Sequence, residues 1–184
     1  MMKAPTHLRE CTEPLKEEEN KRRLFFKRYD LDNENIYTAN IKCHCGNYVF
    51  EFLYPAGGSK SHPCTVEIND SFFFLLKAKC INCGEEHLLF DADFHGWDGW
   101  ICHDEKQAGL PRPSLTSWKC DRCSSSKQRG VVIINSQGQD DFIEETGENF
   151  NIERWQDAFD WFTLDIRCEE CNKEVHNFIS YETM

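Results

Sequence analysis

The chain has 184 residues, of which 29% are charged, and its formal net charge is −11 at pH 7. This length suits one mid-sized domain or two small ones, and the acidity argues against a nucleic-acid-binding protein. The longest apolar run, residues 72–76, is too short to cross a bilayer, so we expect a soluble protein without membrane contact.

Residues 1–30 are dense in charge and predict a helical arm in front of the rest of the chain. Residues 12–26 carry acidic side chains first and basic side chains later, an order that suits the helix dipole, and Thr12 is the expected N-cap. The apolar residues at 24–26 are expected to dock this arm on the first half of the chain.

Two later stretches, 74–90 and 162–178, align without a gap, because Phe162 lies 88 positions after Phe74. The matched pairs include Cys80 with Cys168, Cys83 with Cys171, and Gly84 with Asn172. Apolar residues alternate on both sides of the cysteines, which predicts a strand, a tight turn and a returning strand. Gly and Asn both tolerate the positive φ that the turn requires. The chain is therefore predicted to contain an internal duplication.

Each half also has a cysteine pair upstream of this repeat, so that each half owns four cysteines. The predicted metal ligands are Cys43, Cys45, Cys80 and Cys83 in the first half, and Cys120, Cys123, Cys168 and Cys171 in the second. Zinc binds four thiolates in a tetrahedron, and two strand-turn-strand knuckles supply them. We expect two structural zinc ions, one in each half. Sharing of ligands across the halves is the alternative.

Other uses of the cysteines are weaker predictions. A basic residue precedes each pair, namely Lys42, Lys79, Lys119 and Arg167, which favours thiolates over disulfides. The 11 cysteines are odd in number and no apolar leader follows Met1, so we expect a cytoplasmic protein with reduced thiols. A thioredoxin-type redox pair would open a helix, which these pairs do not. Iron in place of zinc stays open.

Proline and glycine at 109–114 place a boundary between a first unit, 31–110, and a second unit, 111–184. In the second unit, residues 151–162 predict a helix with Asn151 as N-cap, because their large apolar side chains recur at helical spacing. This apolar stripe is interpreted as core.

Residues 90–105 have no counterpart in the second half and are rich in aromatic and polar side chains. We interpret them as a binding loop for another protein, with His95, Trp97, Asp98, Trp100 and His103 as the candidate contacts. Two alternatives are open: the tryptophans cover the core seam between the halves, or His95, Cys102 and His103 form a third metal site.

The cysteine turns resemble zinc-ribbon-like modules and the β-tent group, in which two knuckles join antiparallel sheets. The stretch KCHCGNYVFEF, 42–52, is similar to the opening motif of glutathione-dependent formaldehyde-activating enzymes, although the further cysteine cluster of that family is missing. Together with the repeat and the N-terminal pattern, the resemblance leads us to expect a mainly β fold with minor α, built from two tandem zinc-knuckle units plus the N-terminal helix. It carries no catalytic residue over.

Two functions follow from these expectations. The favoured one is a zinc-binding protein-interaction or regulatory module, because closed four-thiolate sites leave no position for a catalytic water. The alternative is a zinc- or thiol-dependent enzyme of the formaldehyde-activating or β-tent type. The unpaired thiols Cys11, Cys64 and Cys102 lie in no nucleophile motif, so we interpret them as inert.

Overall fold

The computed structural model describes residues 2–21, 29–58, 64–68, 71–102, 113–147 and 150–183. His103, the apolar residues at 24–26 and part of the expected boundary at 109–114 lie outside these ranges. Within them the protein is mainly β, with ten strands: β1 (Thr12–Pro14), β2 (Ile36–Ile41), β3 (Phe50–Pro55), β4 (Thr65–Ile68), β5 (Ser71–Cys80), β6 (Glu86–Asp91), β7 (Leu115–Ser117), β8 (Gln128–Asn135), β9 (Trp161–Cys168) and β10 (Glu174–Glu182).

The helical segments among the described residues are short. They are the 3₁₀ turn η1 (Thr6–Leu8), the helix α1 (Glu17–Lys21), the π-helical turn η2 (Trp97–Ile101), the helix α2 (Gln139–Thr146) and the 3₁₀ segment η4 (Ile152–Asp157). The expected mainly β fold with minor α is confirmed.

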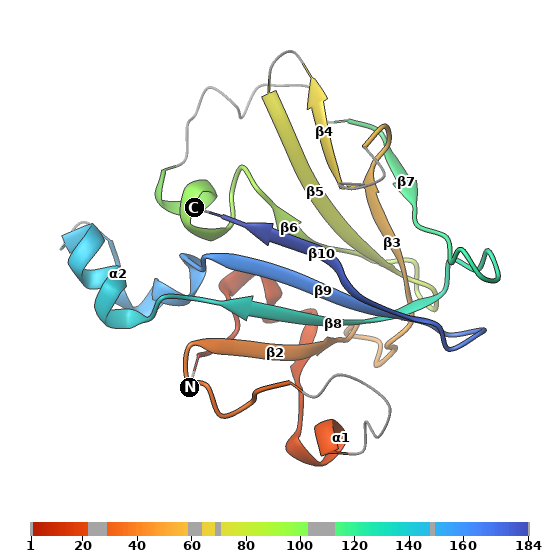
Figure 1. The fold of residues 1–184 in the computed structure, drawn as a ribbon, viewed down its shortest axis with the longest axis horizontal. Coiled ribbons are helices and arrows are strands. Elements are labelled where there is room, and N and C mark those ends of the chain that lie inside the picture. Colours follow the sequence, from red (N-terminus) through yellow and green to blue (C-terminus); the bar gives the residue numbers. More distant parts are fainter. Residues whose placement is uncertain are drawn as a thin grey trace.

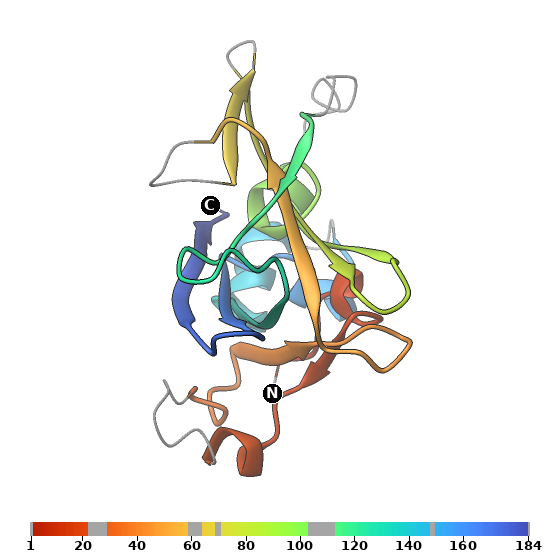
Figure 2. The same ribbon diagram turned by 90° about the vertical axis from the view of Figure 1, so that its right-hand side faces the viewer.

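The strands form one curled antiparallel sheet in the order β1-β2-β8-β3-β5-β4. Strand β9 pairs with β8 and β10 with β9, while β6 pairs with β5 and β7 with β3. Figure 1 shows β2, β8, β9 and β10 running across the molecule and β3, β4 and β5 rising steeply from them. The turns that carry the cysteines gather at the right-hand end of this view and face the reader in Figure 2.

The two halves follow the same pairing pattern around their cysteine turns. Cys80 pairs with Phe50 of β3, and Cys168 pairs with Gln128 of β8. The first strand of each half, however, pairs with the other half, since β2 lies beside β8 and β7 lies beside β3. One sheet thus contains strands from both halves. The internal duplication and the boundaries at 30 and 110 stay predictions.

The core lies on the inner face of the curled sheet and also draws on both halves. Phe50, Phe52 and Phe90 meet Phe159 and Phe162 there, and all five side chains are fully buried. Each such aromatic side chain buries about 150 to 250 Å², so the five together contribute a large share of the core.

Gly130 of β8 fits the crowded centre of this core. A Cβ at this position would lie 2.7 Å from the side-chain tips of Ile41 and Phe52, so the close approach of these side chains requires a glycine.

The N-terminal residues belong to this core rather than to a separate helix. Leu8 is fully buried, and Thr12–Pro14 pair with Ala39–Ile41 of β2. The expectation that Thr12 caps a helix is therefore wrong, because pairing with the open edge of β2 outweighs local helix propensity. The helix α1 begins only at Glu17, with three glutamates in its first turn as the dipole argument requires.

The second expected helix, 151–162, is confirmed only at its start. The Asn151 side chain accepts a hydrogen bond from the Glu153 N–H, as an N-cap does. The segment is a 3₁₀ helix that ends at Asp157, and Phe162 lies in β9 with its side chain in the core. Three-residue spacing of apolar side chains fits both helix types, so the pattern did not show where the helix ends.

Candidate metal centres

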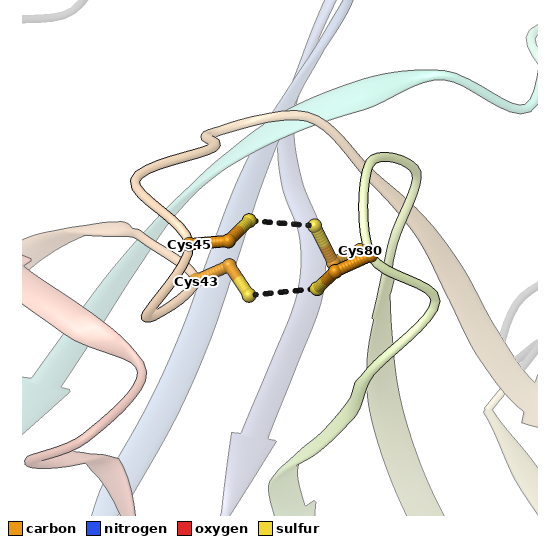
Figure 3. A group of neighbouring side chains, drawn as sticks. Cys43, Cys45 and Cys80 are labelled. Carbon is orange, nitrogen blue, oxygen red and sulfur yellow. Dashed lines mark hydrogen bonds between the residues drawn. The ribbon is translucent and has the colours of Figure 1, made fainter.

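The first four cysteines meet where two turns face each other. Cys43 and Cys45 lie in the turn between β2 and β3, while Cys80 ends β5 and Cys83 lies in the turn to β6. The Sγ atoms of Cys45 and Cys80 are 3.6 Å apart, and those of Cys43 and Cys83 are 3.5 Å apart (Figure 3). All four sulfurs lie within 4.8 Å of one another, so this group could hold a metal ion.

The second four cysteines repeat this arrangement with the residues of the second half. The Sγ atoms of Cys120 and Cys171 are 3.6 Å apart, and those of Cys123 and Cys168 are 3.5 Å apart. They too lie within 4.8 Å of one another. Each cluster thus takes its sulfurs from one half, as the spacing predicts, and no cysteine of one half joins the cluster of the other.

These separations fit ligands of a shared ion. Zinc–sulfur bonds of about 2.3 Å in a tetrahedron place sulfurs about 3.8 Å apart, whereas a disulfide needs about 2.05 Å. All cysteine thiols are free. None of the four cysteine pairs opens a helix, so a thioredoxin-type redox pair is not formed.

The four turns share a backbone conformation that points the sulfurs inward. The residues after the second cysteines, Gly46, Gly84, Ser124 and Asn172, have φ between 55° and 84°. In each turn the amide of that residue donates to the carbonyl of the first cysteine, as Gly84 does to Cys80 at 2.9 Å. The positive φ expected at Gly84 and Asn172 is therefore confirmed, and it closes the knuckle.

Hydrogen bonds around the turns lower the pKa of three cysteines, Cys45, Cys80 and Cys168, and so favour their thiolates. Burial alone would raise the pKa of Cys80, but the Cys83 N–H and the Asn47 side chain donate to its sulfur and lower the pKa to about 6. At Cys168 burial is likewise outweighed by the N–H groups of Cys171 and Glu170, which lower the pKa to about 7. Thiolates are the form that binds metal.

The surroundings of the two clusters differ. Beside the first cluster lie His44, Glu85 and His87, and these three residues with Cys43 form a further group whose ligand atoms lie within 4.8 Å of one another. The sequence reasoning missed this group, because its members come from two knuckles that meet only in the fold. The available signal was a histidine between Cys43 and Cys45 and another shortly after Cys83.

The candidate binding loop folds into the π-helical turn η2. Trp100 lies half-buried, stacked on Phe142 of α2 at 6.1 Å between ring centroids, and packs against Phe150 at 5.7 Å. Trp97 meets Phe142 edge-on at 6.4 Å, and Asp98 is exposed.

His95 faces the interior instead of solvent. Its ring stacks on His7 at 3.6 Å and accepts a hydrogen bond from the Asp91 N–H. His103 lies outside the described residues. Among the described residues, no potential metal group includes His95 or Cys102, which gives no support to the third metal site considered from the sequence.

Thr183, which directly follows β10, holds the turn η2 in place. The Trp97 N–H donates to Thr183 Oγ1 at 3.0 Å, and the Asp98 N–H donates to the Thr183 carbonyl at 2.7 Å. Gly96, with φ of 76°, makes this approach possible, because a Cβ there would lie 2.5 Å from the Thr183 side chain. The loop is therefore fixed by the end of β10.

A cavity of about 480 Å³ lies on the outer face of the sheet, over β8, β9 and β10. Asp165 lies at its base, 5% exposed, and its Oδ2 accepts hydrogen bonds from Tyr29 at 2.6 Å and from His176 Nδ1 at 3.1 Å. Arg129 and Arg167 also line the cavity, and Arg129 binds Glu169 through two hydrogen bonds.

No model of a known protein family, no curated protein and no solved structure matches the chain. The likeness to zinc ribbons and β-tent proteins thus remains a resemblance of motif. Within the described part of the chain, no helix has the length and apolarity needed to span a membrane.

Proposed function

We propose that this protein is a zinc-binding module with two structural ions, which acts by binding another protein in a reducing compartment such as the cytoplasm. One observation carries the metal assignment: two separate sets of four cysteine sulfurs, with sulfur pairs at 3.5 and 3.6 Å, on four turns of one backbone conformation. Four thiolates complete the coordination of zinc and leave no position for water, which favours a structural role.

The position of the clusters explains what the ions would stabilise. Each cluster joins the turn after the first strand of its half to the turn after β5 or β9. Because those first strands, β2 and β7, pair with the opposite half, the two ions would hold together a sheet whose halves exchange strands. Structural zinc of this kind contributes on the order of 10 kcal/mol to folding.

Elemental analysis of the purified chain tests the metal assignment. We expect two zinc ions per chain after dialysis and no disulfide in the intact mass. Two iron ions per chain would show that the bound metal is iron and would leave the assignment of the two sites unchanged. One ion or none, or disulfides among the eight cysteines, would overturn the assignment.

The interaction surface is proposed around η2 and α2, at the end of the molecule opposite to the cysteine turns (Figure 1). Four large apolar residues among the described ones are exposed, and three of them, Phe94, Ile143 and Ile152, belong to the segments that pack around Trp100. Exposed apolar side chains next to half-buried aromatic ones are typical of protein-binding surfaces.

The charge around these residues indicates the kind of partner. Asp98 and the exposed acidic side chains of α2, Asp140, Asp141, Glu144 and Glu145, surround the apolar residues. A partner with an apolar patch and a basic rim suits this surface. Trp97 and Trp100 would shape it from below, while His95, stacked on His7, positions the loop.

Substitutions of the exposed residues test this surface better than substitutions of the tryptophans, because truncating a tryptophan would also remove packing contacts of α2. We expect the double substitution Phe94→Ser, Ile143→Ser to abolish cross-linking to native partners identified by mass spectrometry, while zinc content and melting temperature stay unchanged. Ile81→Ser is the matched control, because Ile81 is the remaining exposed apolar residue and lies at a cysteine turn. Unchanged cross-linked partners in the double variant would refute this surface.

The alternative function, a zinc- or thiol-dependent enzyme, is supported by fewer observations. Burial raises the pKa of Cys11 and of Cys64 to about 12, so both thiols are protonated at neutral pH and are poor nucleophiles. Cys102 is exposed but lies in no potential metal group of the described residues.

A second candidate function is the binding of a small anionic ligand in the cavity above Asp165. The Arg167 guanidinium lines this cavity and forms no hydrogen bond or close ion pair with the residues that the structure describes, although its charge helps to lower the pKa of Glu169. A carboxylate or phosphate group could bind its guanidinium. A thermal-shift screen of small anions tests this function, and any stabilisation must be lost in Arg167→Met.

A further inference from the structure

The two cysteine clusters differ at two positions that correspond between the halves and lie next to the cysteines. Beside the second cluster, Lys173 Nζ lies 2.6 and 2.7 Å from the two carboxylate oxygens of Asp121, a simple exposed ion pair. At the same positions of the first cluster, one residue after the first cysteine and two after the last, the chain has His44 and Glu85. These residues are metal ligands by type, and the contact between them is an ion pair only when His44 is protonated.

A third potential ligand, His87, also distinguishes the first cluster from the second. His87 pairs with Ala78 in the ladder between β5 and β6, and Val175 has the same place between β9 and β10, opposite Ile166. The His87 side chain is only 10% exposed, and its Nε2 lies 3.3 Å from Cys43 Sγ. The first half thus adds a nearly buried imidazole where the second half has an aliphatic side chain.

The distances among Cys43, Glu85 and His87 match a common ion. Bonds of about 2.3 Å to sulfur and about 2.0 Å to nitrogen or oxygen place tetrahedral ligands about 3.3 to 3.6 Å apart. Glu85 Oε2 lies 3.5 Å from Cys43 Sγ and 3.6 Å from His87 Nε2. His44 Nδ1 lies 3.8 Å from Cys43 Sγ and in contact with Glu85 Oε2, closer than two ligands of one ion lie, so binding of a common ion requires the exposed His44 or Glu85 side chain to shift.

We propose that the first cluster is binuclear: a second divalent ion is bound by His44 Nδ1, Glu85 Oε2 and His87 Nε2, and the Cys43 thiolate bridges it to the four-cysteine ion. This inference rests on the proposed zinc role of Cys43. Imidazole nitrogen with thiolate selects zinc or a neighbouring transition metal over calcium or magnesium.

Charge also favours a second ion. The four thiolates and Glu85 carry five negative charges, and one divalent ion leaves an excess of three, whereas two divalent ions leave an excess of one. Two metal ions about 3.5 to 4 Å apart are a common arrangement in proteins.

The second ion is expected to exchange more readily than the first. The side chains of His44 and Glu85 are 65% and 41% exposed, so solvent and competing ligands reach the ion from that side. Cys80 and the other sulfurs of the four-cysteine ion are not shared. The chain would therefore hold two ions tightly, one in each half, and a third one more weakly.

Equilibrium dialysis of the tag-free full chain against buffered free zinc tests the proposal. We expect two tight equivalents and a third, weaker one in the wild type. The variant His44→Ala, Glu85→Gln should keep the two tight equivalents and its melting temperature, and bind the third about 100-fold more weakly or not at all. The control variant Asp121→Asn, Lys173→Gln alters the corresponding places of the second half and should keep all three.

Cobalt substitution gives an independent readout. The third cobalt equivalent should produce a new sulfur-to-cobalt charge-transfer band, because Cys43 is among its ligands, and this band should be lost in His44→Ala, Glu85→Gln. Two tight equivalents without a third would overturn the binuclear site and leave the proposed function standing. A third equivalent that persists in the variant would equally overturn it, and fewer than two tight equivalents would overturn the proposed function itself.

Discussion

The Tyr29 hydroxyl donates a 2.6 Å hydrogen bond to Asp165 Oδ2, and so ties the segment before β2 to the middle of β9. The Asn177 N–H donates to the other carboxylate oxygen at 2.7 Å, from a residue with φ of 49° at an irregularity in β10. Burial would raise the pKa of Asp165, but hydrogen bonds led by that of Tyr29 outweigh it and lower the pKa. Asp165 is thus a buried, ionised acceptor.

Asp165→Asn should destabilise the fold by about 2 to 3 kcal/mol, because it replaces a charged acceptor with an amide that turns an N–H group toward existing donors. A carboxyl with a lowered pKa stabilises the fold above the unfolded value near 4 and loses that effect as pH falls through the folded pKa. The deficit measured by denaturant unfolding should therefore be constant between pH 7 and 5.

Tyr29→Phe is the control for this prediction. It removes one hydrogen bond and keeps the charge, so a loss of about 1 to 2 kcal/mol is expected. If both variants are as stable as the wild type, the carboxylate network contributes nothing to folding.

Cys80→Ser should release the ion of the first cluster and broaden or abolish cooperative unfolding, because the site then has three thiolates and a poor fourth ligand. The second cluster takes its sulfurs from the second half alone, so one equivalent of zinc should remain bound. Zinc content and thermal unfolding are measured on the same sample. The exposed Cys102, changed to Ser, should match the wild type in both, and equal damage from the two substitutions would contradict a metal role for Cys80.

The knuckles were predictable because their determinants are local. Cysteine spacing, the alternation beside it and Gly84 or Asn172 in the turn are all within a few residues of one another. The exchange of β2 and β7 between the halves was not predictable in the same way, because alternation indicates a strand but not its neighbour. Thr12 shows the same limit, since its pairing with Ile41 depends on an edge formed elsewhere in the chain.

In the candidate site, too, residues with local determinants were predictable and residues that depend on the fold were not. The eight cysteines could be assigned from type and spacing alone. His87 reaches Cys43 only because β6 folds back beside β5, so its proximity is a property of the sheet register. The burial of His95 against His7 likewise depends on the N-terminal residues, which the sequence indicated as a separate arm.

Gly96→Ala should destabilise the turn η2 more than an ordinary glycine substitution. At Gly96 the new Cβ would lie 2.5 Å from the Thr183 side chain, and φ is 76°. Gly147→Ala is the control, because Gly147 also has a positive φ, of 60°, but nothing lies within 4 Å of its Cβ position. The control measures backbone strain alone, about 1 kcal/mol.

We expect Gly96→Ala to cost about 1 to 3 kcal/mol more than this control, as overpacking does. The Trp97 and Asp98 amides should also lose their protection from hydrogen exchange, because Thr183 accepts from both. Equal stability losses in the two variants would mean that Thr183 moves aside without cost.

The stacked pair His7 and His95 should make the fold less stable as pH falls. Burial lowers the pKa of His7 to about 4, although its hydrogen bond to the Leu89 carbonyl opposes this, and burial lowers the pKa of His95 to about 3. His7 raises the cost of protonating His95, and Asp157 nearby partly offsets it. Both rings are therefore neutral in the folded protein but protonate near pH 6.5 in the unfolded chain. The stability that these two neutral rings contribute is fully present above pH 6.5 and is progressively lost as the pH falls below it.

His7→Gln tests this, because glutamine can still donate to the Leu89 carbonyl but does not titrate. The wild type should be the more stable at pH 7.5, and its advantage should shrink by about 1.4 kcal/mol at pH 5.5, the free energy of protonating one unfolded histidine one unit below its pKa. Comparing the two chains at each pH in excess zinc cancels the effect of acid on the cysteines. An advantage that does not change with pH would show that His7 is not held neutral by burial.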